Sequence, residues 1–235
     1  MSEFSVILPA AGGSTRFTGF AEKKTHIDLL GAPVWQRTAE IFSSRSDVGE
    51  VIVVVAPEEL ADFRDRFSDQ LRGLITTAGG ATRAHSVQNG LSVSNHAFPF
   101  VAVHDAARPL VSSQVIDRAF EAVRMTGAAV PGVPVTSTVK RVDSAGQILA
   151  TVDRSALRLA QTPQSFSRQV LETAYQQAGA ALEQFTDESS LVEAAGHPVT
   201  VTEGCWKNIK ITTTDDYRLA QMLLSAADSQ AGSQP

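Results

Sequence analysis

A run of five β-branched residues, Val-Ile-Val-Val-Val at positions 51–55, narrows the possible folds more than any other segment of this chain. Continuous runs of this kind are typical of strands buried on both faces, and such strands occur mainly in parallel sheets. Further strand-like runs occupy residues 4–8, 74–78, 100–104, 128–133 and 199–203. The sequence therefore predicts an α/β fold with a mostly parallel, doubly wound sheet, in which ligands sit at the carboxyl ends of the strands.

Helices are expected between these strands, where prolines or capping residues mark several of the starts. Thr213 and Asp216 have the spacing of a capping box for the last helix. The stretch around Thr162-Pro163-Gln164 has no regular pattern and is expected to be irregular. The predicted helices span residues 33–43, 57–68, 82–93, 112–125, a segment starting at 167, 189–195 and 215–227.

Residues 134–153 interrupt this alternation. Two β-prone stretches, 136–142 and 147–152, flank Asp143-Ser144-Ala145-Gly146, which is a hairpin signal. The pattern is too polar for a central strand, so we expect an arm that projects from the domain. A plain surface hairpin and a dimerisation arm are equally good interpretations. No linker or repeat divides the chain, which predicts a single domain over residues 1–227 and a flexible tail over 228–235.

Charge and the length of the apolar runs argue against two classes of partner. The formal net charge of −5 is unlike that of a nucleic-acid binder, which normally carries a basic stripe. The apolar runs are too short to cross a bilayer, and the first residues lack the pattern of a signal peptide. Cys205 is the only cysteine, so it forms no intramolecular disulfide, and we expect a small buried hydrophobe. These features predict a cytoplasmic protein that binds neither nucleic acid nor membrane.

The loop after the first predicted strand reads Pro9-Ala10-Ala11-Gly12-Gly13-Ser14-Thr15-Arg16. Small residues let backbone N–H groups approach an anion closely, and successive amides form an anion-binding nest. Arg16 and the Lys23-Lys24 pair add cations that suit phosphate oxygens. A glycine-rich turn with solvated cations is the equally weighted alternative. The segment matches neither a P-loop nor a dinucleotide-binding fingerprint.

Three further segments carry residues suited to an anionic ligand. Gly79-Gly80, between a strand and a helix, suits backbone recognition of a base edge, although a tight turn is the better interpretation of this segment taken alone. Asp105 is a candidate Mg²⁺ ligand because Mg²⁺ prefers one or two carboxylates plus substrate phosphates; a structural ion pair with Arg108 is the alternative. Lys210, in the β-prone run 208–212, either faces a ligand from the sheet end or is an exposed edge lysine. The histidines lack zinc-site spacing, and no Gly-x-Ser-x-Gly elbow is present.

Taken together and in this order, these segments resemble the 2-C-methyl-D-erythritol 4-phosphate cytidylyltransferases of the non-mevalonate isoprenoid pathway. The likeness extends from about residue 5 to residue 220. It rests on the Pro-Ala-Ala-Gly loop, Gly-Gly-x-x-Arg-x-x-Ser-Val, His-Asp-Ala-Ala-Arg-Pro, Thr-Pro-Gln, Thr-Asp-Glu and Asn-Ile-Lys. The resemblance implies a Rossmann-like nucleotidyltransferase fold, CTP and a polyol phosphate as substrates, Mg²⁺ as cofactor, and a homodimer whose arms reach the partner's site.

The resemblance also implies roles for individual residues. Arg16, Lys24, Arg154 and Lys210 would be catalytic through their charge, and Asp105 would bind Mg²⁺. Thr138 and Arg154, in or beside the arm, would hold the methylerythritol phosphate of the neighbouring subunit. The expected substrate-binding residues are Ala10, Ala11, Gly12, Gly80, Ser86, Ala106, Arg108, Thr138 and Thr162. The chain departs from the family in two places. The family usually reads Gly-x-Gly-x-Arg-Met, whereas Gly13-Ser14-Thr15-Arg16-Phe17 lacks the later glycine. Lys23-Lys24-Thr25 stands where the family has Pro-Lys-Gln, so Lys23 rivals Lys24 for the catalytic role.

The implied reaction is attack by the substrate's phosphate oxygen on the α-phosphorus of CTP. A phosphate monoester is mostly dianionic near neutral pH and needs no general base, so catalysis would rest on positioning and charge neutralisation. Three alternatives stay open at this point. They are a ribitol 5-phosphate cytidylyltransferase, a sugar-1-phosphate nucleotidyltransferase, and a non-catalytic module that senses CTP.

Overall fold

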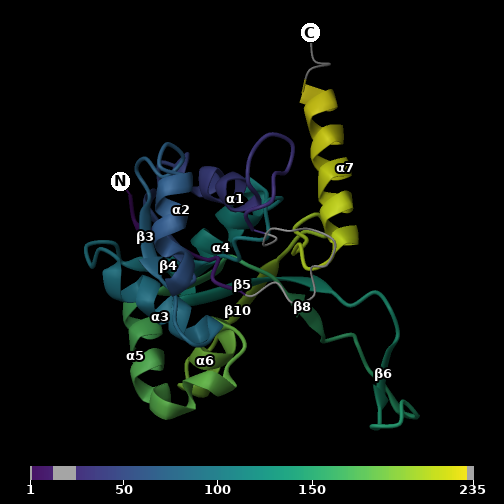
Figure 1. The fold of residues 1–235 in the computed structure, drawn as a ribbon. Coiled ribbons are helices and arrows are strands. Elements are labelled where there is room, and N and C mark those ends of the chain that lie inside the picture. Colours follow the sequence, from purple (N-terminus) through teal and green to yellow (C-terminus); the bar gives the residue numbers. More distant parts are fainter. Residues whose placement is uncertain (1, 13–24, 232–235) are drawn as a thin grey trace.

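Strand β1 (Phe4–Pro9) lies between β2 (Val48–Val55) and β4 (Phe100–Val103) and is parallel to both. The computed structural model describes residues 2–12 and 25–231, with side chains described through residue 226 (Figure 1). β3 (Ile75–Ala78) extends the parallel set beside β2. This arrangement confirms that the β-branched run at 51–55 belongs to a parallel sheet, and all five of its residues are buried.

The other half of the sheet contains the antiparallel pairs. β9 (Gln164–Ser167) is inserted between β4 and β5 (Ala128–Pro134), antiparallel to each of them. β10 (Thr200–Glu203) runs parallel to β5, and β8 (Arg158–Ala160) pairs antiparallel with β5. Within the described residues the sheet has eight strands, in the order β10-β5-β9-β4-β1-β2-β3 with β8 attached to β5. The predicted fold class, mostly parallel with helices between strands, is confirmed.

Helices cover both faces of this sheet (Figure 1). One core joins β1, through Phe4, Val6 and Leu8, to α1, α2 and α4. The alternate face of the same strands, including Ile7 and Ile52, packs against α3, α5 and α6. The helices are α1 (Val34–Ser43), α2 (Leu60–Arg66), α3 (Arg83–Val93), α4 (Ser113–Thr126), α5 (Arg168–Ala178), α6 (Glu188–Ala194) and α7 (Thr214–Ala231), with 3-10 turns η1 (Pro57–Glu59) and η2 (Gly179–Gln184).

Side-chain caps fix several of the helix starts. The Thr82 hydroxyl accepts the N–H of His85 at the start of α3, and Ser112 caps α4 in the same way. The predicted capping box is present at α7. There the N–H of Thr213 donates to Asp216 Oδ2 over 2.8 Å, and the N–H of Asp216 donates to Thr213 Oγ1 over 3.2 Å. These caps confirm the starts that the sequence predicted for α3, α4 and α7 to within a residue.

Three expectations about local structure were wrong. The stretch expected to be irregular contains β8 and β9, because β8 pairs with β5 and β9 pairs with both β4 and β5, with Phe166 of β9 buried in the core on one face of the sheet. The β-prone run 208–212 forms no strand. The last helix continues to Ala231, beyond the end at residue 227 that the sequence predicted.

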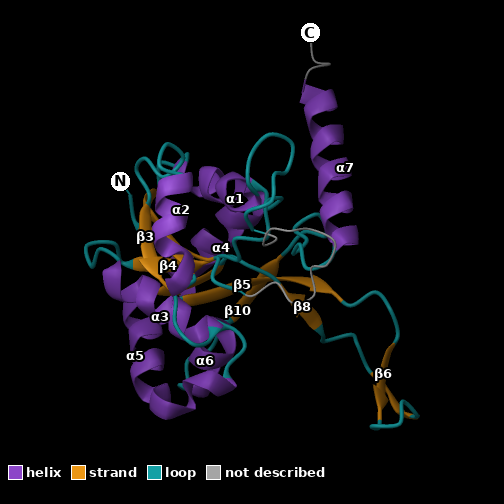
Figure 2. Ribbon diagram, viewed as in Figure 1, coloured by secondary structure: helices purple, strands orange, loops and turns teal. Residues whose placement is uncertain are grey.

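The predicted hairpin is present as β6 (Val139–Val142) paired antiparallel with β7 (Ile148–Val152). These strands form a separate two-stranded sheet that projects from the body of the molecule (Figure 2). Its residues are largely exposed, including Val142, Ile148 and Leu149. Among the described residues, no helix combines the length and the apolar character needed to cross a membrane.

Candidate functional site

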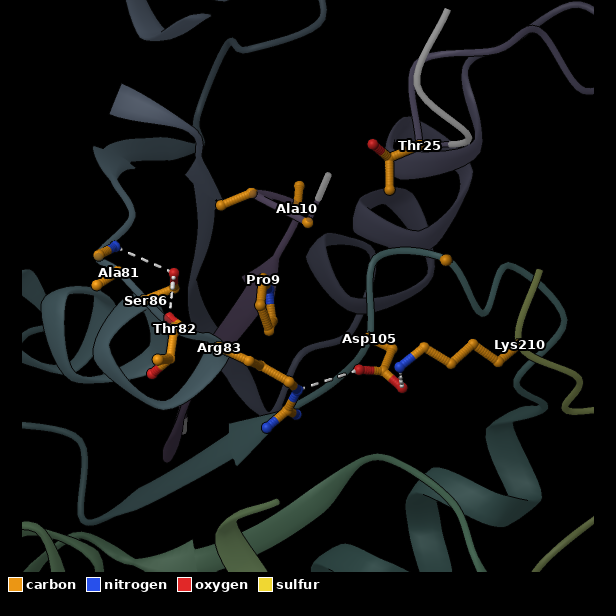
Figure 3. A pocket seen from close by; sticks show the side chains of 13 residues that line it. Pro9, Ala10, Thr25, Ala81, Thr82, Arg83, Ser86, Asp105 and Lys210 are labelled. Atoms are coloured by element: carbon orange, nitrogen blue, oxygen red, sulfur yellow. Dashed lines mark hydrogen bonds and ion pairs between the residues drawn. The ribbon is translucent and has the colours of Figure 1, made fainter. Parts of the chain in front are cut away.

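A cavity of about 260 Å³ opens at the carboxyl ends of β1, β3 and β4 (Figure 3). This is the edge where ligands bind in doubly wound sheets, because the loops that follow parallel strands gather there. Among the described residues, five chain segments line the cavity. They are the loops after β1, β3 and β4 and the segments that carry Thr25 and Lys210. The lining residues are Pro9, Ala10, Ala11, Gly12, Thr25, Gly80, Ala81, Thr82, Arg83, Ser86, Asp105, Ala107 and Lys210.

The loop after β1 presents a small-residue surface to the cavity. The N–H of Ala10 continues the β1–β2 pairing by donating to Val54 O over 2.7 Å, which fixes the position of the loop as it leaves the sheet. Ala10, Ala11 and Gly12 therefore lie where the sequence placed them, along the cavity. The predicted catalytic residues Arg16 and Lys24, and the rival Lys23, lie outside the described residues.

The loop after β3 packs tightly against the first loop. A Cβ at Gly79 would lie 2.8 Å from both Ala11 Cβ and Ser86 Oγ, which is closer than atoms of this kind approach one another. The Ser86 hydroxyl accepts the N–H of Gly80 over 3.1 Å and donates to Thr82 O over 2.9 Å. Two predicted binding residues are thus joined directly, and both line the cavity beside the N-terminus of α3. The N–H groups and the dipole at such a terminus favour anions.

Asp105, immediately after β4, is the centre of a cluster of cations. Its Oδ2 atom lies 3.0 Å from Lys210 Nζ, and its Oδ1 atom lies 3.5 Å from Arg83 Nε (Figure 3). The Oδ2 atom also lies 3.1 Å from Arg108 Nε. Only 7% of this residue is exposed. Burial by itself would raise the pKa of Asp105, but Lys210, Arg83 and Arg108 outweigh burial and hold that pKa well below its ordinary value. The carboxylate is therefore ionised at neutral pH.

A second, smaller cavity of about 150 Å³ adjoins the first. Arg83, Asp105 and Lys210 line both cavities and so form the wall between them. Predominantly polar side chains complete the second cavity, including the predicted binding residues Arg108 and Thr162. The remaining lining residues are Ala160, Gln161, Gln164, Thr186 and Asp187.

His104 orients the residues around Asp105. Its ring is fully buried, with Nε2 3.1 Å from Arg108 O and Nδ1 3.0 Å from Thr162 Oγ1. Burial lowers the pKa of His104 to about 4, so the ring is neutral. Its Nε2–H can therefore donate to Arg108 O while Nδ1 accepts the Thr162 hydroxyl proton. That hydroxyl in turn accepts the N–H of Asp105 over 3.2 Å.

The segment that carries Lys210 belongs to no strand and is held mainly by side-chain hydrogen bonds. Asn208 is completely buried, its Nδ2 donates to Thr162 O over 2.8 Å, and its carbonyl accepts Arg108 Nη1 over 2.7 Å. Gln161 exchanges two hydrogen bonds with the backbone of Cys205. The N–H of Ile211 donates to Ala107 O over 2.8 Å. These bonds place Lys210 beside Asp105.

Other predicted residues lie elsewhere. Ala106 is completely buried and its carbonyl accepts the Thr38 hydroxyl, whereas the next residue, Ala107, lines the cavity. Thr138 and Arg154 are exposed at the arm and line neither described cavity. The Arg154 guanidinium donates to the carbonyl of Thr136.

Sequence reasoning assigned no role to Arg83 or Glu188. Arg83 is the arginine of the Gly-Gly-x-x-Arg pattern, and this position was the available signal. Glu188 belongs to the Thr-Asp-Glu pattern, and both of its carboxylate oxygens contact Arg83 Nη1, over 2.8 and 2.9 Å. The structural role of Asn208, the first residue of Asn-Ile-Lys, was likewise not predicted from the sequence.

The donor chemistry at Asp105 fits a magnesium ion. Asp105 supplies one ionised carboxylate, which together with substrate phosphates and water is a set that Mg²⁺ prefers. It is the only carboxylate in the described part of the first cavity wall. The described residues contain no cluster of three or more His, Cys, Asp or Glu that could hold a metal by themselves. The site thus suits a cation that arrives with phosphate rather than one enclosed by protein.

Comparison with known proteins gives a consistent result over nearly the whole chain. The profile of the family described as IspD, 2-C-methyl-D-erythritol 4-phosphate cytidylyltransferase, matches residues 4–226. The 2-C-methyl-D-erythritol 4-phosphate cytidylyltransferase of Bacillus velezensis is 40% identical over 228 residues, which cover 95% of this chain and 97% of that protein. The bifunctional enzyme IspD/IspF of Anaeromyxobacter dehalogenans is 43% identical over 220 residues. That match covers 92% of this chain but 56% of the relative, so the chain spans about half the length of the bifunctional relatives.

Solved structures show the same likeness. The crystal structure of 2-C-methyl-D-erythritol 4-phosphate cytidylyltransferase from Thermus thermophilus superposes with a TM-score of 0.77 at 34% identity, covering 95% of this chain and 98% of that one. The 4-diphosphocytidyl-2C-methyl-D-erythritol synthase of Anaerococcus prevotii gives a TM-score of 0.81 at 28% identity, covering 95% and 99%. Fold and sequence therefore agree along the same length of chain.

Proposed function

The chain belongs to the 2-C-methyl-D-erythritol 4-phosphate cytidylyltransferase family, and on this premise we propose that it transfers CMP from CTP to 2-C-methyl-D-erythritol 4-phosphate in non-mevalonate isoprenoid precursor biosynthesis. The observation that carries the proposal is the pair of adjoining cavities, which share a wall of cationic side chains around Asp105. A reaction that joins two phosphorylated molecules needs two binding sites that meet at a positively charged point.

The first cavity suits the nucleotide. Ala10, Ala11, Gly12 and Gly80 line the cavity, and Ser86 holds the loop after β3 through its hydrogen bonds with Gly80 and Thr82. Because these residues have small side chains, their backbone groups can bind phosphate oxygens and the edge of a base directly. The second cavity suits a polyol phosphate, because hydroxyl and amide groups lie beside cations there.

The chemistry follows from the charges. A phosphate oxygen of the polyol substrate attacks the α-phosphorus of CTP, a new P–O bond forms, and the bond from that phosphorus to the bridging oxygen breaks. Pyrophosphate leaves with the electron pair of the broken bond. The attacking phosphate is already anionic, so the protein has no proton to remove. Its task is to hold two anions together, and Lys210, at the shared wall, is placed to neutralise charge there.

The remaining cations complete this proposal. Arg16 and Lys24 keep the catalytic roles that the family resemblance implies, with Lys23 as the rival of Lys24. Asp105 would hold Mg²⁺, which supplies neutralising charge on phosphate oxygens when bound. In the structure, the Asp105 carboxylate pairs with Lys210, Arg108 and Arg83. When metal and substrate phosphates bind, these three side chains would contact the phosphates instead.

We also propose a homodimer formed through the arm. A two-stranded sheet is marginally stable by itself, yet β6 and β7 are well formed with Val142, Ile148 and Leu149 exposed. Such apolar exposure on a projecting element suits burial against another subunit. Arg154 and Thr138 would then reach the second cavity of the partner. Equilibrium sedimentation tests the dimer, and a concentration-independent monomer mass would refute it.

We further propose a cytoplasmic enzyme with no nucleic-acid or membrane partner. The single cysteine, Cys205, is a free thiol, and the net charge of −5 disfavours polyanions outside a local cationic site. Fractionation of cells that express the protein tests its location. Recovery of the protein with membranes or ribosomes at physiological salt would contradict this proposal.

The activity is tested by pyrophosphate release with CTP and Mg²⁺, in the presence and absence of 2-C-methyl-D-erythritol 4-phosphate. Release that requires the methylerythritol substrate supports the proposal. A preference for ribitol 5-phosphate, or for a sugar 1-phosphate with a purine triphosphate, would replace it with another transferase. Binding of CTP without release of pyrophosphate from any acceptor would leave the sensor function.

A further inference from the structure

Arg83 stands in the wall between the two cavities, at the first position of α3. We infer that Arg83 binds a phosphate group where the cavities meet, and that buried Glu188 is the positioning residue that holds it there. The inference rests on the proposed function, because it adds one phosphate-binding group and its support to the same site.

The contacts of the Arg83 guanidinium with other described residues involve two of its three nitrogens. Nη1 is held by both oxygens of Glu188, and Nε faces Asp105 Oδ1 at 3.5 Å. Nη2 has no hydrogen-bond partner among the residues that the structure describes. A guanidinium has five N–H donors in a rigid fork, so fixing two nitrogens fixes the direction of the third. Arg83 therefore presents donors of known direction to the cavities.

Glu188 is buried whereas Arg83 is partly exposed, as expected if Glu188 positions Arg83 and Arg83 binds phosphate. Only 1% of Glu188 is exposed, and its Oε1 also lies 3.4 Å from the Tyr175 hydroxyl. The Arg83 side chain keeps 27% of its surface exposed and lines both cavities. The carboxylate thus lies behind the arginine and away from solvent, while the arginine reaches the space where substrates would meet.

Arg83 is positively charged at neutral pH. Burial would lower the pKa of Arg83, but the carboxylates of Glu188 and Asp105 outweigh burial and raise it above the ordinary value. A fixed, charged fork matches the paired oxygens of a phosphate, as it matches those of a carboxylate. When substrate phosphate arrives, Arg83 can keep Glu188 on Nη1 and offer Nη2 to the phosphate.

The competing explanation is that Arg83 only ties α3 to α6 through Glu188. The two explanations differ in what a substitution does to ligand binding in the folded protein. The test compares Arg83→Gln, Arg83→Lys and Glu188→Gln, with Arg72→Gln as a control that removes the same charge from a side chain that is 83% exposed and lines neither described cavity. Inorganic pyrophosphate binding is measured by calorimetry, cytidylyl transfer by pyrophosphate release, and folding by the thermal unfolding midpoint.

We expect Arg83→Gln to lower kcat/KM by about 100-fold, in line with the loss of one preorganised charge-stabilising donor, and to weaken pyrophosphate binding about tenfold or more. Arg83→Lys should recover part of both losses, because it keeps the charge but not the fork. Glu188→Gln should lower kcat/KM by less than Arg83→Gln does, since the cation remains but is less firmly held. Arg72→Gln should match the parent.

Unchanged pyrophosphate affinity and unchanged kcat/KM in folded Arg83→Gln, with a fall in the unfolding midpoint alone, would overturn the inference. If that variant does not fold because Glu188 is left unpaired, Arg83→Gln combined with Glu188→Gln removes the unpaired charge and the same comparison is made. If the parent transfers no cytidylyl group, the proposed function fails. The calorimetric comparison then still decides whether Arg83 binds phosphate.

Discussion

Replacing Lys210 with alanine should separate activity from stability. Lys210 Nζ lies 3.0 Å from Asp105 Oδ2 in the wall between the cavities, and its side chain is 36% exposed. Removing one preorganised charge from an active site typically costs about 2.7–4 kcal/mol of transition-state stabilisation. Since about 1.4 kcal/mol corresponds to tenfold in rate, kcat should fall by about two to three decades.

The effect on folding should be much smaller. Ion pairs with a well-exposed member contribute about 0–1 kcal/mol, and Asp105 would keep Arg108 at 3.1 Å and Arg83 at 3.5 Å after the change. For a chain of this size, a loss of 1 kcal/mol lowers the unfolding midpoint by about 2–4 °C. Lys210→Ala should therefore remain folded under the conditions of the activity assay.

The assay is steady-state pyrophosphate release with CTP and methylerythritol phosphate, paired with a thermal unfolding curve for each protein. Lys207→Ala is the matched control, because Lys207 lies on the same segment but is exposed and lines neither cavity. A turnover number for Lys210→Ala within a few fold of the parent would refute the assigned role. A large fall in the unfolding midpoint would refute the stability argument.

Three further substitutions probe the surroundings of the site. Gly79→Ala introduces a Cβ 2.8 Å from two atoms of neighbouring side chains, so overpacking should lower the free energy of unfolding by about 1–3 kcal/mol, measured by urea denaturation. Asn208→Ala removes the donor to the carbonyl of Thr162 and should lower kcat as well as stability, the latter by about 1–3 kcal/mol. Burial lowers the pKa of His104 from 6.5 to about 4, so the unfolded chain takes up this proton first. Stability from this group is complete above about pH 6.5 and should fall by about 3 kcal/mol as the pH drops to 4, a slope that His104→Gln would lack.

Each of these three expectations has a result that contradicts it. An unchanged urea midpoint in Gly79→Ala would mean that the two loops separate easily. Full activity in Asn208→Ala would mean that Lys210 is held by other contacts. Identical pH dependence of unfolding for the parent and His104→Gln between pH 4 and 6.5 would mean that the ring is accessible to protons in the folded protein.

Elements with strong local patterns were predictable, and elements made by long-range pairing were not. β2 follows from its β-branched run, and the start of α7 follows from Thr213 and Asp216. β9 has the sequence Gln-Ser-Phe-Ser, with one apolar residue, and is a strand because its backbone pairs with both β4 and β5 while Phe166 packs into the core on one face of the sheet. The run 208–212 is β-prone, yet its order comes from the side chains of Gln161 and Asn208. Neither result could be read from the local sequence.

The candidate site shows the same division. Loops at the carboxyl ends of strands were predictable, and Ala10, Gly80, Ser86 and Asp105 line one cavity as expected. Which of two successive alanines faces that cavity depends on how the loop turns, and the structure favours Ala107 over Ala106. The meeting of Arg83 with Glu188, across 105 positions, has no counterpart in either local pattern.

The composition of the ion-pair cluster argues that it is built for a ligand. Replacing a buried ion pair with well-packed apolar residues is often neutral or stabilising, so folding alone gives little reason to collect charges at one place. Here three cations, Arg83, Arg108 and Lys210, are linked to two carboxylates, Asp105 and Glu188. The linked set carries an excess of positive charge and borders two cavities. Asp187 adds a further carboxylate to the wall of the second cavity, so the excess of positive charge faces the first cavity, where Asp105 is the only carboxylate among the described lining residues. We therefore expect an anion that enters the first cavity to offset part of that positive charge.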